Sequence, residues 1–167
     1  MSNFYSTEPV ANPQAINATS TTQKLPLGTI VRALDKADTA YGVGEFIYLS
    51  GLASTAVGEV VVYNAVDFST KLAVENDIGP VATSMSINLA SQYGWYQISG
   101  KGVALVSASF ADDANCYLTA TAGTMDDNDV SGDQIRRMKG ASAIGTPSTG
   151  LAEVEMSRPE VNDLVDN

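Results

Sequence analysis

The chain has 167 residues, a net charge of −10 at pH 7 and no histidine, and its 19 Asp and Glu outnumber its 9 Lys and Arg. This balance opposes binding to nucleic acid, because affinity for phosphate backbones comes from clustered Lys and Arg. Without histidine, the commonest general base and metal ligand is missing, and a Ser-His-Asp or Cys-His catalytic arrangement cannot form. We therefore expect no nucleic-acid partner, no enzymatic activity, no catalytic residue and no cofactor.

Residues 1–26 are rich in Ser, Thr, Asn, Gln and Pro, and their few apolar residues follow no period. Alone, such a segment cannot bury enough surface to offset its ordering entropy. We expect either a mobile tail or an extended N-terminal arm that becomes ordered on a neighbouring subunit. In the second case Phe4, Tyr5, Val10 and Ile16 are the candidate anchors that contact a capsid or a subunit.

The N-terminal stretch "MSNFYSTEPVANPQ" has neither the basic region nor the apolar region of a signal peptide. The longest charge-free stretch, residues 78–100, contains Pro80 and many polar residues, so it is not a membrane-spanning helix. We expect a soluble protein made in a cytoplasm, with no membrane partner.

Residues 27–159 form the predicted body. Short β-rich runs recur about every ten residues and are bounded by Gly, Asn, Asp or Ser, which predicts an all-β fold: a compact antiparallel β-sandwich or barrel. Residues 160–167 are expected to form an acidic C-terminal tail. The predicted strands cover residues 27–34, 44–50, 58–64, 70–76, 79–87, 93–100, 101–107, 115–121, 134–142 and 150–156.

The stretch "SQYGWYQISGKGVALVSASF", residues 91–110, combines aromatic and small side chains. Gly100 and Gly102 flank Lys101, and we expect a tight, hairpin-like connection there between two strands. Trp95 could be an aromatic platform for a ligand such as a sugar. The simpler interpretation, which we favour, is that the stretch forms part of the wall of the core.

The acidic stretch "DDNDVSGD", residues 126–133, resembles a calcium loop at its start, with Asp127 and Asp129 at positions one and three. Position twelve is Met138, where an EF-hand requires Glu, and neither flank is predicted to be a helix. The EF-hand is excluded. A different calcium loop that uses Asp127, Asp129 and Asp133 stays open beside the ordinary interpretation as a turn.

Other chemically suggestive residues have structural interpretations. The carboxylate pairs Asp112–Asp113 and Asp126–Asp127 lie in turn-like surroundings, so we interpret them as solvated loops rather than as a glycosidase pair. The basic run "RRMK" at 136–139 is short, and we expect a solvated strand or turn. The single Cys116 is expected to be a small buried side chain, with an intermolecular disulfide as the alternative.

Four segments share a texture of small residues: "YGWYQISGKGVALVSA", "CYLTATAGTMDD", "GDQIRRMKGASA" and "GLAEVEMSRP". An aromatic-Gly strand leads to Gly-flanked small-residue strands, a "TAG" turn with acids, a "GA" strand and a last strand ending at Arg158–Pro159. From about Gly79 onward the chain resembles the head decoration, or capsid cement, proteins of tailed bacteriophages. The resemblance covers about half of the chain and leaves residues 1–26 and the tail unexplained.

This resemblance implies a virion structural protein on the outer capsid surface, made in the host cytoplasm. Its partners would be the major capsid protein and neighbouring copies of itself, as a trimer or an arm-linked oligomer. Two alternatives stay open. One is a β-sandwich module that binds glycans or the host surface, and the other is a tail-tube or head–tail adaptor component.

Overall fold

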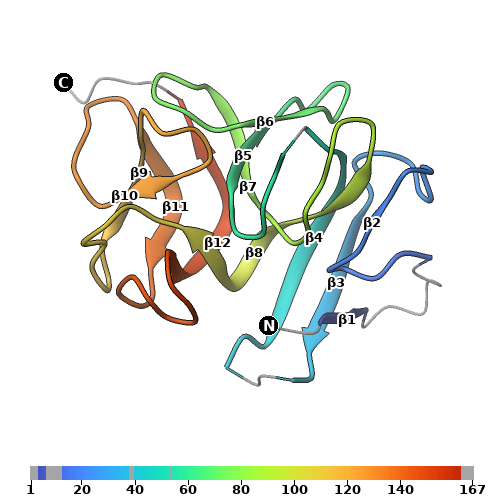
Figure 1. Ribbon diagram of the computed structural model, residues 1–167, viewed down its shortest axis with the longest axis horizontal. Helices are drawn as coiled ribbons and strands as arrows, with labels where there is room; N and C mark the ends of the chain where they lie inside the picture. Colours follow the sequence, from blue (N-terminus) through green and yellow to red (C-terminus); the bar gives the residue numbers. More distant parts are fainter. Residues whose placement is uncertain (1–3, 7–12, 38–39, 53, 163–167) are drawn as a thin grey trace.

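The computed structural model describes residues 4–6, 13–37, 40–52 and 54–162, and this part of the chain is all-β (Figure 1). The named strands pair antiparallel throughout, so the predicted fold class is confirmed. The described residues include no helix of the length and apolarity needed to cross a membrane. The strands are β1 (Phe4–Ser6), β2 (Thr19–Ser20), β3 (Ile30–Asp35), β4 (Val43–Ser50), β5 (Val60–Tyr63), β6 (Thr70–Leu72), β7 (Gly79–Ser84), β8 (Tyr93–Leu105), β9 (Asn115–Leu118), β10 (Met125–Asp126), β11 (Gln134–Gly140) and β12 (Leu151–Val161).

The sheet order is β1-β3-β4-β8-β7-β12-β11-β9-β10, and the sheet is not closed into a barrel. Strand β8 has 13 residues and joins the two sides of the molecule. Its first part pairs with β4, and its last part pairs with β12. In Figure 1 the N-terminal strands lie to the right of β8 and strands β9 to β11 lie to its left.

The hairpin expected around Lys101 is wrong. Residues 99–105 pair without interruption with residues 151–157, so the chain continues in one direction through both glycines. Gly100 has φ +95°, and the β4–β8 ladder shifts register between Glu45 and Phe46, which is the behaviour of a bulge rather than of a turn. Two glycines around a charged residue are compatible with a hairpin turn and with a bulged strand. The uninterrupted pairing with β12 shows that the strand continues.

Other predicted boundaries also move. Strand β6 ends at Leu72 instead of continuing to residue 76. Strand β12 continues to Val161, so the first residues assigned to the tail, 160–161, belong to the sheet and pair with β7. The short strand β10, which pairs with β9, was not among the predicted strands.

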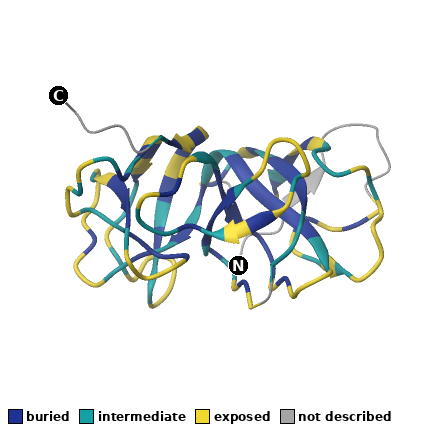
Figure 2. Ribbon diagram, turned by 90° about the horizontal axis from the view of Figure 1, so that it is seen from above, coloured by how far each residue is buried: buried dark blue, intermediate teal, exposed yellow. Residues whose placement is uncertain are grey.

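The buried side chains form three clusters. One cluster lies under β9 to β12, and the other two lie on opposite faces of β4 and β8. Strand β5 separates two of them, because Val60 and Val62 point into the first cluster and Val61 points into the third. The burial colouring of Figure 2 places most of the buried residues in the strands, where they alternate with more exposed ones, and most of the exposed residues in the connecting loops.

Candidate interaction surface

Residues 13–26 lie on the chain's own sheet. Ile16 is 1% exposed and packs in the cluster that contains Tyr48 and Trp95. The side chain of Gln14 accepts a hydrogen bond from the Tyr48 hydroxyl at 2.9 Å, and its backbone carbonyl accepts one from Trp95 Nε1 at 3.0 Å. The expectation that Ile16 contacts a neighbour is therefore wrong, because its own core already buries it, and the boundary proposed at residue 26 falls within the packed body.

The other predicted anchors lie nearer the N-terminus. Strand β1 pairs with β3 of the same chain, with Phe4 opposite Asp35 and Tyr5 opposite Leu34. It is the strand at one end of the sheet. Val10 lies outside the described residues. Contact between Phe4 or Tyr5 and a neighbouring subunit stays a prediction.

Trp95 belongs to the core. Its side chain is 0% exposed, and its ring centroid lies 5.0 Å from that of Tyr48. Tyr96, on the opposite face of β8, is also fully buried, and burial raises the pKa of its hydroxyl. The interpretation of this stretch as wall is confirmed, and a ligand platform at Trp95 is excluded by its burial.

The acidic stretch 126–133 does not assemble a metal site. Asp133 is 3% exposed, and its Oδ1 accepts the backbone N–H of Asn76 at 2.6 Å. Asp127 Oδ2 accepts the backbone N–H of Ala111 at 2.9 Å, whereas Asp129 is exposed. Across the described ranges, no three Cys, Asp or Glu side chains gather in a way that could hold a metal ion. The structure therefore does not bring the three proposed calcium ligands together: Asp127 and Asp133 each hold a different loop, and Asp129 is exposed.

The basic run at 136–139 is solvated. The run at 136–139 lies in strand β11 with its cationic residues exposed, which confirms a solvated strand. Lys139 Nζ lies 3.4 Å from Asp113 and 3.5 Å from Glu155, and these carboxylates raise the pKa of Lys139.

Cys116 is buried and forms no disulfide within the described residues, and burial raises the pKa of its thiol to about 12.

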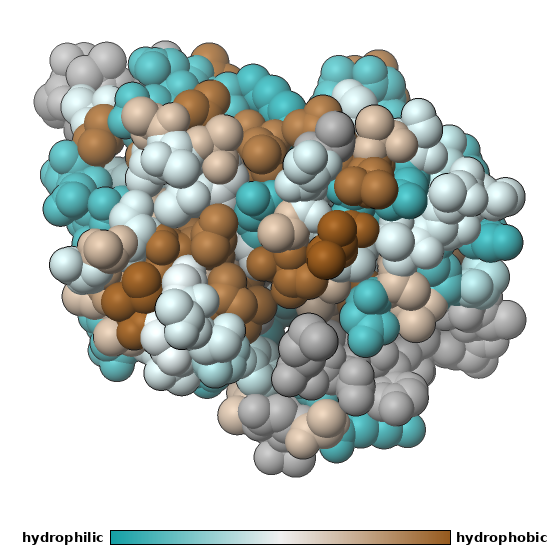
Figure 3. All heavy atoms as spheres, in the orientation of Figure 1, coloured by the Kyte–Doolittle hydropathy of each residue, from teal (hydrophilic) through white to brown (hydrophobic). Residues whose placement is uncertain are grey.

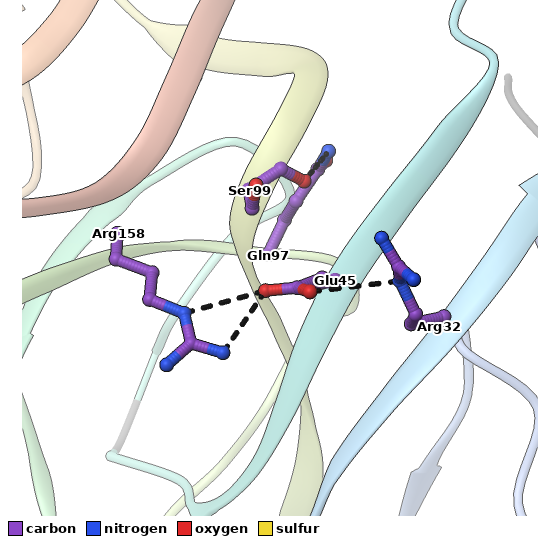
Figure 4. Close-up of polar contacts among 5 residues, drawn as sticks. All are labelled: Arg32, Glu45, Gln97, Ser99 and Arg158. Carbon is purple, nitrogen blue, oxygen red and sulfur yellow. Dashed lines mark hydrogen bonds and ion pairs between the residues drawn. The ribbon is translucent and has the colours of Figure 1, made fainter.

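The sequence pattern did not reveal the ion-pair centre at Glu45 (Figure 4). The Glu45 carboxylate lies 3.6 Å from Arg32 Nε and accepts hydrogen bonds from Arg158 Nε and Nη2 at 3.3 and 3.2 Å. It thereby links β3, β4 and β12. Arg158 and Glu45 are 113 positions apart in the sequence, and only the pairing of β4 and β12 with β8 brings them together.

Gln97 is fully buried beside this centre and is held by the backbone. Its Nε2 donates to the carbonyl oxygens of Ser99 at 3.1 Å and of Lys101 at 2.9 Å. A Cβ at Gly102 would overlap Gln97 Oε1, so the glycine makes room for the side chain in this position. The second glycine of "GKG" is therefore explained by packing against Gln97 and not by a turn.

The described part of the surface includes two shallow grooves. The first, of about 450 Å³, lies on β11 and β12 and includes Arg136, Met138 and Met156. The second, of about 460 Å³, lies between the β5–β6 hairpin and the start of β7 and includes Ile78, which is 66% exposed. Hydrophobic groups lie among polar ones on the face drawn in Figure 3. Such relief suits contact with another protein surface.

No protein-family model matches the chain, and no curated protein matches it in sequence.

Proposed function

We propose that this chain is a non-enzymatic structural protein of a bacteriophage virion, which binds the outer surface of the capsid and stabilises it. One observation supports this most. The four segments that carry the resemblance to capsid decoration proteins build consecutive neighbours in the sheet: β8, β12, β11, β9 and β10.

These segments also share a core. Residues from β8 to β12 supply most of one buried cluster, in which Ala104, Leu118 and Val154 are 0% exposed. Strands that follow one another along a chain are commonly neighbours in an antiparallel sheet. The shared core shows that these segments form one structural unit, and the family expectation for this half of the chain rests on their residues.

The charge and shape of the surface support the proposed location. A net charge of −10 disfavours contact with packaged DNA and suits a protein on the outside of the shell. The shallow grooves and the exposed apolar side chains of Val66 and Ile78 suit broad contact with a protein lattice. Many symmetric copies would turn modest contacts into strong attachment.

The test is binding to bare shells of the phage whose genome encodes the chain. Purified protein mixed with such shells is expected to co-sediment saturably, at a fixed number of copies per capsid subunit, and to raise the temperature at which the shells break. Shells of an unrelated phage serve as the control.

Failure to bind the cognate shells would reject the proposal. Binding to a glycan array without shell binding would favour the glycan- or host-binding module instead. Rings or tubes in negative stain would favour a tail-tube or adaptor component.

A further inference from the structure

Ile87 and Leu89 stand apart from the other exposed apolar side chains. They are 62% and 48% exposed, and the sequence has no charged residue between positions 78 and 100. Every other large hydrophobic residue that is exposed in the described ranges has a charged residue within two positions of it in the sequence. These pairs are Ile30 with Arg32, Val43 with Glu45, Val66 with Asp67, and Ile78 with Asp77.

The loop between β7 and β8 holds these two side chains outward. Asn88, which lies between them, is 0% exposed, and its Nδ2 donates a hydrogen bond to the Tyr96 hydroxyl at 3.1 Å. Its backbone N–H and carbonyl bond to the carbonyl and N–H of Thr55, at 3.2 and 3.0 Å. Because successive side chains of extended backbone alternate in direction, burial of Asn88 turns Ile87 and Leu89 to solvent. The loop is fixed before any partner binds, so binding costs little ordering entropy.

Gln92 joins this loop to two other segments. Its side-chain Oε1 accepts hydrogen bonds from the backbone N–H of Leu89 at 2.9 Å and from the Thr19 hydroxyl at 3.1 Å. Its backbone carbonyl accepts the N–H of Gly51 at 2.7 Å. The three joined segments contain no charged residue in their sequence. We call this surface the neutral end, and it comprises residues 13–23, 51–52, 54–58 and 85–92.

The charge of the chain determines which partner the neutral end suits. The net charge is −10, so two copies repel each other, and like charges placed across an interface are strongly unfavourable. Two copies therefore approach most easily where neither presents charge, and a second neutral end meets this condition while covering Ile87 and Leu89. At its border, the Glu59 carboxylate accepts the backbone N–H of Ala56 at 2.7 Å. A basic partner would instead be attracted to the acidic remainder of the surface.

We propose that the neutral end is the face through which two copies of this chain associate. Because both sides of the contact have to be neutral and apolar, the same face serves on each copy, which makes the contact two-fold. Ile87 and Leu89 of one copy pack against the same residues of the other. This inference does not rest on the proposed function, since self-association is measured without capsids.

Sedimentation velocity of the full chain over a range of concentrations tests the inference. The wild type is expected to form dimers. Ile87→Asp is expected to weaken dimerisation about tenfold or more, because it places two like charges across the two-fold contact. The matched control is Ile78→Asp, which makes the same change at a residue that is 66% exposed and lies outside the neutral end, and it is expected to dimerise as the wild type does. Circular dichroism checks that both variants are folded, and Leu89→Asp gives a second measurement.

The salt dependence of dimerisation gives a readout that does not depend on a substitution. Salt screens the repulsion between two acidic chains, so association across a neutral contact is expected to strengthen as the salt concentration rises. A contact made of exposed charge pairs would weaken over the same range.

A wild-type chain that stays monomeric up to about 1 mM would overturn the inference, as would equal dimerisation by the two variants or dimers that weaken with salt. If Ile87→Asp dimerised as the wild type does but no longer bound cognate shells, the neutral end would be a capsid contact instead. A dimer that is lost in Ile87→Asp, in a chain that binds no shells, would support this inference and reject the proposed function.

Discussion

The two sides of β8 are stabilised in different ways. The aromatic half, which comprises residues 13–27, β3, β4 and the first part of β8, buries large rings such as Tyr48 and Trp95. The aliphatic half, which comprises the last part of β8 and β9 to β12, buries smaller side chains such as Leu118 and Val154.

The two halves differ in what their buried side chains need. A buried tyrosine or tryptophan carries a polar group that needs a partner. In the aromatic half Gln14 is that partner for both Tyr48 and Trp95. The buried aliphatic side chains need only shape and alternation. Their cluster also takes in Val60 and Val62 of β5 and Val81 of β7, but no residue of the N-terminal segment.

The largest effect is expected from Trp95→Ala in the aromatic half. Loss of this fully buried ring should lower the free energy of unfolding by about 3–5 kcal/mol, measured by urea denaturation with circular dichroism. Hydrogen exchange should increase more in β3 and β4 than in β11. Trp95→Phe, which keeps a ring but loses the bond to Gln14, should cost less. Equal loss of protection in β11 would mean that the two halves unfold as one unit.

Ile16→Ala tests whether the N-terminal segment belongs to its own chain. Because Ile16 is 1% exposed, the substitution should destabilise the isolated chain by about 2–5 kcal/mol. Val66→Ala is the control, since Val66 is 88% exposed and should change stability by less than about 0.5 kcal/mol. If Ile16→Ala weakened only subunit association, the original interpretation as an intersubunit anchor would be restored.

Gly102→Ala tests the strand that both halves share. The added Cβ would overlap Gln97 Oε1, so we expect a loss of about 1–3 kcal/mol in urea denaturation. The control is the same substitution in a Gln97→Ala background. There the overlap is removed and Gly102→Ala should cost less, which a double-mutant cycle measures. Equal costs in the two backgrounds would show that Gln97 is not the reason for the glycine.

Cys116 provides the smallest effect, confined to the aliphatic half. Burial raises the pKa of its thiol to about 12, whereas the pKa of a thiol in an unfolded chain is about 8.5. As pH rises, the thiol of the unfolded chain therefore loses its proton before the native thiol does. The contribution of this thiol to the free energy of unfolding declines between the unfolded and the native pKa. A thiol reagent at pH 8 should label the native chain slowly and the urea-unfolded chain rapidly. Rapid labelling of Trp95→Ala under native conditions would contradict the independence of the aliphatic half.

The sequence predicted correctly the strands whose apolar and polar side chains alternate clearly. Alternation in "GLAEVEM" identified strand β12 and its buried face, with Ala152, Val154 and Met156 all in the core. The small, separated β-rich runs identified the all-β class. Residues 13–26 were misassigned because their composition resembles a tail, and their ordering depends on single contacts such as Gln14 with Trp95 that have no periodicity.

The all-β class, the short strands and the solvated charged runs could be predicted from the residues alone, because these features follow from the burial preference of each residue and its nearest neighbours. Tertiary structure alone decided that β8 continues through Gly100, that Glu45 meets Arg32 and Arg158, and that Ile16 is buried. The physical reason is that these features depend on which distant strands pair, and pairing partners are chosen by the packing of the whole sheet.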